Sequence, residues 1–182
     1  MSQPPSISEM ISQSIQVLQK PKAATFEQFE NKGTLREALV YVALCAAVSG
    51  LVGALPRGPM GFVAGVATAV IGFLVFTYVV HAFGKGQGGT GTLDQVAYSF
   101  SLFWGPISVV SSLLVLVLVV TIVGLLLVPA VLLATLAANV YFAYLAIQSS
   151  MNMTESSKVW ITLLVAAGAT FISFMLVGAL LG

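Results

Sequence analysis

The chain has 182 residues, of which 58% are hydrophobic and only 7% charged, and its formal net charge is +1. A soluble domain carries about 25% charged residues, so this chain cannot cover a surface that faces water. The composition therefore excludes an ordinary soluble domain or a nucleic-acid-binding protein, and it predicts a membrane protein with several spanning helices.

Before the first hydrophobic run, the pattern predicts a short amphipathic helix. Its apolar residues recur at helical spacing: Ile7, Ile11, Ile15 and Leu18. Ser6 and Glu9 have the spacing of a capping box, and Pro21 ends the segment because proline cannot continue the helical hydrogen-bond ladder. We expect residues 1–34 to form a cytoplasmic segment whose helix lies on the inner membrane face.

Five hydrophobic runs are long enough to cross a bilayer, which takes about 20 apolar residues per helix. They cover residues 35–55, 60–83, 96–120, 124–147 and 159–181. The first run begins too late for a secretory signal peptide, so we expect it to be a retained span. The sequence therefore predicts an all-α fold, a polytopic membrane helical bundle with five transmembrane helices in one domain, residues 35–182.

The distribution of basic residues predicts the orientation of these spans. With a cytoplasmic N-terminus, the inner segments hold all but one of them: Lys20, Lys22, Lys32, Arg36, Lys85 and Lys158. The outer segments hold only Arg57. Because Lys and Arg favour the cytoplasmic side, we predict that the N-terminus is cytoplasmic and the C-terminus lies outside.

Residues 84–91, GKGQGGTG, contain two overlapping G-x-G-x-x-G patterns. In a dinucleotide site this pattern follows a strand of a parallel sheet, whereas here it follows a run of spanning length. Lys85 is the only lysine of this stretch and precedes most of the glycines, whereas the phosphate-binding P-loop has its lysine after the last glycine. The P-loop pattern therefore also fails. We therefore expect no cofactor, and we interpret the glycines as the end of the second span and a flexible cytoplasmic loop.

The start of the third span has a polar side. Thr92 and Gln95 have capping-box spacing, and Asp94 lies in the first turn, where a negative charge is favourable. Asp94 and Ser99 lie on one side of the helix, and Phe100 lies on the other. The polar side indicates a partner helix or a water-lined crevice on the inner side.

The stretch GGTGTLDQVAYSFSLFWGP, residues 88–106, resembles the most recognisable part of the Yip family of five-span membrane proteins. The positions that carry the resemblance are Gly88, Gly89, Thr90, Thr92, Tyr98 and Pro106. Of these, Gly88, Gly89, Tyr98 and Pro106 are candidates for an interaction surface or crevice. The approach to the first span and the SSKVW start of the fifth also resemble that family. The resemblance covers about residues 18–182.

This resemblance implies an integral membrane protein without known catalytic residues. Eukaryotic Yip proteins bind prenylated Rab GTPases and act in traffic between the ER and the Golgi. This chain departs from them in its short cytoplasmic N-terminal segment, which argues against a GTPase partner and favours a prokaryotic member in the plasma (inner) membrane. We expect a non-enzymatic scaffold or adaptor that associates in the bilayer with itself or with another membrane protein.

Small residues at four-residue spacing allow helices to approach closely in lipid, and Gly61 with Gly65 is the best such pair. Pro106 lies inside the third span, where it is expected to kink the helix. With His81 as the single histidine and Cys45 as the single cysteine, the sequence offers no catalytic set and no metal site of several soft ligands.

The fourth span carries a polar group formed by Asn139, Tyr141 and Tyr144. The simpler interpretation is structural, with the Asn139 amide bonded to another helix. The alternative is a binding crevice between the third and fourth spans that these residues would line with Ser99, Ser108 and Ser111. Such a crevice would make the protein a small channel or carrier for a neutral solute or lipid, since no Asp, Glu, Lys, Arg or His of the kind typical of ion paths lies deep in the spans.

Overall fold

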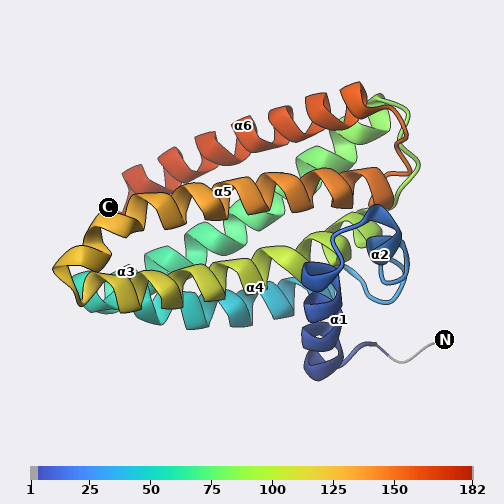
Figure 1. Ribbon diagram of the computed structural model, residues 1–182. Helices are drawn as coiled ribbons and strands as arrows, with labels where there is room; N and C mark the ends of the chain where they lie inside the picture. Colours follow the sequence, from blue (N-terminus) through green and yellow to red (C-terminus); the bar gives the residue numbers. More distant parts are fainter. Residues whose placement is uncertain (1–3, 182) are drawn as a thin grey trace.

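The computed structural model describes residues 4–181, apart from the side chains of residues 53, 56, 57, 122, 123 and 181. Over this range the chain is helical, with elements α1 (Ile7–Gln19), α2 (Ala23–Glu27), α3 (Leu35–Gly86), α4 (Leu93–Val119), α5 (Ile122–Ser150) and α6 (Ser156–Leu181) (Figure 1). The side chain of Arg57, which the basic-residue pattern assigns to the outer face, lies outside the described part.

The long element α3 consists of two helices that meet at Gly58. Gly58 has φ +63° and ψ −155°, a conformation that favours glycine. At this point the chain turns back on itself (Figure 1). The two halves of α3 supply the spans Leu35–Val52 and Gly58–Gly86, and α4, α5 and α6 bring the spans among the described residues to five. The predicted all-helical fold with five spans is confirmed.

Capping boxes fix the first residue of three helices. The pairs are Ser6 with Glu9, Thr34 with Glu37, and Thr92 with Gln95. In each pair the two side chains bond the free backbone N–H groups at the helix start, and losing such a cap costs about 1 kcal/mol. The first and third pairs were predicted from the sequence, and both are confirmed.

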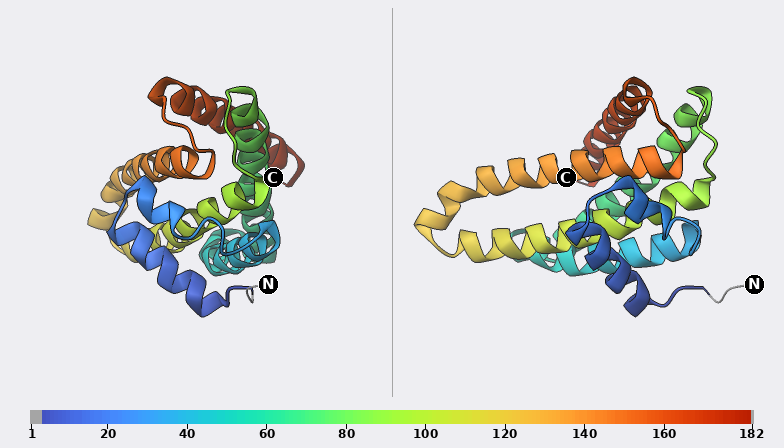
Figure 2. Two further views of the ribbon diagram at one scale, coloured as in Figure 1. Left: turned by 90° about the vertical axis from the view of Figure 1, so that its right-hand side faces the viewer. Right: turned by 45° about the vertical axis from the view of Figure 1, so that its right-hand side comes forward.

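The spans are not evenly packed. The α3 helices pack against α4 and α6, and α4 packs against α5, whereas α5 and α6 touch only lightly. Figure 2 shows α5 and α6 running in diverging directions from the turn that joins them. At one end α1 packs on α4 and α2 on α5. We call this the closed end; it also holds the α3–α4 loop and the α5–α6 turn, and Gly58 and the α4–α5 turn lie at the other (Figure 1).

The buried core is concentrated towards the closed end. Phe26 of α2 is fully buried and meets Phe103 of α4 edge to face, with ring centroids 6.1 Å apart. Phe103 in turn stacks on Phe142 of α5 at 5.8 Å. Away from this cluster α5 exposes large side chains, including Leu126 and Leu133. The closed end is therefore held by protein contacts, and the opposite half presents apolar surface to lipid.

Candidate functional site

The first glycines of the α3–α4 loop are needed for a tight backbone path. Gly88 has φ +93°, which a residue with a side chain rarely adopts. A Cβ on Gly89 would lie 2.7 Å from Cε of Met151 and 2.9 Å from the carbonyl oxygen of Gly84. Gly88 and Gly89, predicted as part of an interaction surface, thus fold the loop back onto the end of α3.

The last glycine of the loop lies against the start of the α5–α6 turn. A Cβ on Gly91 would overlap the carbonyl oxygen of Ser150. Beside it the N–H of Thr90 donates to the carbonyl of Met151 at 3.0 Å, and Asn152 Nδ2 donates to the Thr90 hydroxyl at 3.1 Å. These glycines serve close packing between two connections, which differs from the free loop expected from the sequence.

The polar side at the start of α4 binds the linker that precedes α3. The Asp94 carboxylate accepts a hydrogen bond from the N–H of Leu35 at 2.8 Å. The Gln95 amide donates to the side-chain oxygens of Asn31 at 3.0 Å and Glu30 at 3.3 Å. These groups hold the α2–α3 linker in place, so the polar side predicted for a crevice is occupied by the chain itself.

Glu30 is a buried carboxyl group at the centre of this linker contact. It is only 6% exposed, and its second oxygen accepts a hydrogen bond from the Ser149 hydroxyl of α5 at 2.8 Å. Burial raises the pKa of Glu30, while the bond from Ser149 lowers it in part. Sequence reasoning missed this residue, because its partners lie far away in the chain.

Tyr98 anchors α1 to the bundle. Its side chain is fully buried, and its hydroxyl donates to the side-chain oxygen Oε1 of Gln13 at 2.8 Å. A second bond, of 3.0 Å, joins the hydroxyls of Ser14 and Tyr41. A Cβ on Gly33 would overlap the Tyr98 ring, so the linker backbone lies directly on that ring. The geometry gives Tyr98 a structural part at the closed end.

The polar residues predicted to line one crevice lie in different places. Asn139 Nδ2 donates to the Thr135 carbonyl of its own helix at 2.9 Å, and not to another helix as expected. The Tyr141 hydroxyl donates to a backbone carbonyl in the α1–α2 linker at 3.4 Å, and that of Tyr144 to a serine in the first turn of α6 at 3.0 Å. Ser99 is buried, and its hydroxyl has no partner among the described residues.

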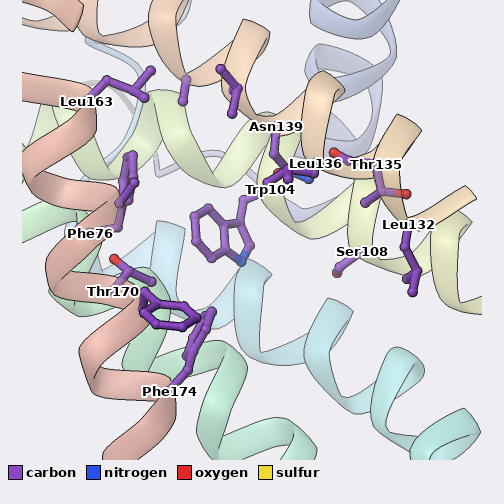
Figure 3. Close-up of a pocket in the computed structure, with 14 residues that line it drawn as sticks. Phe76, Trp104, Ser108, Leu132, Thr135, Leu136, Asn139, Leu163, Thr170 and Phe174 are labelled. Carbon is purple, nitrogen blue, oxygen red and sulfur yellow. Dashed lines mark hydrogen bonds between the residues drawn. The ribbon is translucent and has the colours of Figure 1, made fainter. Parts of the chain in front are cut away.

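A groove of about 460 Å³ lies between α5 and α6. Trp104 and Phe76 form its floor, and Phe174 and Leu132 stand at its sides (Figure 3). Its polar side chains are Ser108, Thr135, Asn139 and Thr170, and all of them make hydrogen bonds within the protein. The side-chain oxygen of Asn139, Oδ1, accepts no bond from the described residues. We call this site the α5–α6 groove; sequence spacing predicted only Asn139 and Ser108 of it.

A second groove, of about 380 Å³, lies between α4 and α5, where the sequence predicted a crevice. Pro106 and Ser111 line it, together with mostly apolar residues such as Ile107 and Phe142. Tyr141, Tyr144 and Ser99 are not part of its lining. The Ser111 hydroxyl is bonded to that of Thr135 at 2.8 Å.

The predicted glycine pair lies where the two halves of α3 approach each other. A Cβ on Gly65 would lie 3.7 Å from the Cα of Gly50, and a Cβ on Gly50 would lie 3.1 Å from Val66. Gly61 is buried one turn earlier. The partner Gly50 was not singled out in the sequence, because the pairing depends on the reversal at Gly58.

The family resemblance rested on residues that the structure gathers at the closed end, with the exception of Pro106. Residues 15–177 match the Yip1 domain. The chain belongs to the Yip1-domain family. No curated protein and no solved structure matches it. In this Yip1 domain, Gly88, Gly89 and Tyr98 have contacts that shape the fold, and the two grooves lie elsewhere, between the spans.

Proposed function

We propose that this Yip1-domain protein is a non-enzymatic membrane adaptor that associates side by side with a spanning helix of a second copy. The α5–α6 groove is the observation that carries this proposal. It is apolar over most of its lining, as the surface that receives a membrane helix has to be. The GTPase partner that the resemblance implies for eukaryotic members is not part of this proposal.

The composition of the groove favours a helix as its occupant. Ala143 and Ala167 lie among the lining residues on facing helices, and small residues allow a third helix to approach closely in lipid. The free side-chain oxygen of Asn139, Oδ1, offers a hydrogen-bond acceptor to that helix, and such bonds are worth about 0.6–2 kcal/mol within a membrane. A polar solute would find few partners here, which counts against the channel or carrier alternative.

Filling the groove is expected to abolish self-association. In Ala167→Trp the indole occupies the space between α5 and α6 that the partner helix would use. The measurement is co-purification of two differently tagged copies expressed together and extracted in mild detergent. The matched control is Ile172→Trp, which puts the same side chain on an exposed position of the opposite face of α6. Equal co-purification of both variants, or none for the unchanged chain, would contradict the proposal.

We also propose that the closed end is cytoplasmic and that the membrane is a prokaryotic plasma (inner) membrane. Supporting this, Lys85 in the last turn of α3 and Lys158 in the first turn of α6 lie at the same end of the bundle as Lys20 and Lys22. Basic residues favour the cytoplasmic side. Reporters that are active on only one side are expected to give a cytoplasmic N-terminus and an external C-terminus. Both termini on one side would show the topology to be wrong.

A further inference from the structure

The helix α1 has three faces, not two. One face is buried against the bundle and consists of Met10, Gln13, Ser14 and Val17. A second is polar and exposed, with Ser8, Ser12, Gln16 and Gln19. Between them runs an apolar edge of Ile7, Ile11 and Ile15, which are 37%, 48% and 49% exposed. These three side chains lie outside the buried core of the described residues and keep much of their apolar surface exposed, so the isoleucine edge needs a separate partner.

Both ends of the isoleucine edge continue into surfaces of the spans. Ile7 lines a small cavity with Val40, which is an exposed residue of the first span, and with the charged residues Arg36 and Glu37 at the start of that span. At the other end Leu18, which follows Ile15 by one turn, lines the α4–α5 groove together with Ile107. The edge is therefore continuous with the apolar surface that the spans present to lipid.

The length of α4 indicates how deep α1 lies in the membrane, because α1 is bonded to a residue of α4. With 27 residues, α4 is about 40 Å long, which exceeds the hydrocarbon core by about 10 Å. The turn after α4 carries no charged residue, so the excess belongs at the closed end, where the charged residues are. Tyr98, which holds Gln13, lies five residues into α4, or about 7–8 Å. This is the level where headgroups meet acyl chains.

We propose that α1 lies in the plane of the membrane surface, with its isoleucine edge inserted into the phospholipid leaflet beside the closed end. Figures 1 and 2 show α1 running across the direction of the spans, as an in-plane helix must. With the bundle on one side, the leaflet below and water above, each of the three faces meets a matching environment. The buried bonds to Tyr98 and Tyr41 hold the helix in that rotation.

Nitroxide labels on neighbouring residues test this rotation in the full chain. In a Cys45→Ala background, single cysteines replace Ile11 on the apolar edge or Ser12 on the polar face. The labelled protein is reconstituted into phosphatidylcholine vesicles, and collisions are measured with oxygen, which enters lipid, and with a water-soluble nickel chelate. We expect the label at residue 11 to collide with oxygen and be shielded from nickel, and the label at residue 12 to show the reverse.

Two results would overturn the proposal. Equal access of nickel to both labels would place the isoleucine edge in water. If oxygen and nickel are both excluded from the label at residue 11 but not from the label at residue 12, protein covers the isoleucine edge. In vesicles that contain only the purified chain, that protein has to be a second copy. Neither result depends on the α5–α6 groove, so the inference about α1 and the proposal of self-association are tested separately.

Discussion

Gly91→Ala is expected to disrupt the docking of the α3–α4 loop on the α5–α6 turn. The added Cβ would overlap the carbonyl oxygen of Ser150 and lie 3.1 Å from the Cα of Met151. These are backbone atoms, so no change of rotamer relieves the overlap. Overpacking of this kind costs about 1–3 kcal/mol, which for a chain of this size lowers the melting temperature in detergent by roughly 2–12 °C.

Gly86→Ala is the matched control for this change. Gly86 is the last residue of α3, and a Cβ placed there meets nothing within 4 Å. Alanine is favoured over glycine in a helix by about 1 kcal/mol, so this variant is expected to melt at the same temperature as the unchanged protein or slightly above it. Equal melting temperatures for the two variants would show that the loop glycines are not required for packing.

The spans were predictable because the signals that specify them are local. A run of about 20 apolar residues identifies a spanning helix without reference to any other part of the chain. The capping pair of Thr92 and Gln95 likewise lies within a single turn. The reversal between the first two spans also has a local signal, because the sequence PRGP at residues 56–59 follows the first run. Gly58 of this sequence takes the conformation that favours glycine.

The use of each helix face was not predictable, because it depends on partners far away in the sequence. Spacing marks Ile7, Ile11 and Ile15 as the apolar side of α1 and predicts a helix on the membrane face, but it does not say which side of α1 packs on the bundle. In the structure the bundle instead takes the side with Gln13, through a residue 85 positions further along the chain. An amphipathic pattern separates only an apolar side from a polar side, whereas a helix at the edge of a membrane protein can contact protein, lipid and water.

The same limit applies to the candidate sites. Asn139, Tyr141 and Tyr144 lie in one six-residue stretch of the fourth span, yet their side chains bond to three different neighbours. The α5–α6 groove draws its floor from Phe76 and Trp104, apolar residues that no polar motif could have marked. Its position follows from the light contact between α5 and α6, which is a property of the packed bundle.

Tyr98→Ala is expected to be among the most destabilising single changes in the closed end. It removes a fully buried ring between Gly33 and α1, and it leaves the side-chain oxygen Oε1 of Gln13 buried without its donor. Replacing a buried aromatic residue by alanine costs about 3–5 kcal/mol. Melting of the purified protein measures the loss. Tyr78→Ala, at a half-exposed tyrosine of α3, is the control and is expected to cost far less.

A double change separates the hydrogen bond from the packing of the ring. Tyr98→Phe keeps the ring but removes the donor to Gln13, and an unsatisfied buried amide costs about 1–3 kcal/mol. Replacing both partners, with Gln13→Met in addition, removes the unpaired group and is expected to recover most of that loss. If the loss of stability in the double variant equals the sum of the losses from Tyr98→Phe and Gln13→Met alone, the bond does not hold α1 in place. Recovery would mean that this residue of the family motif acts by fixing the rotation of α1, and with it the face that α1 turns to the membrane.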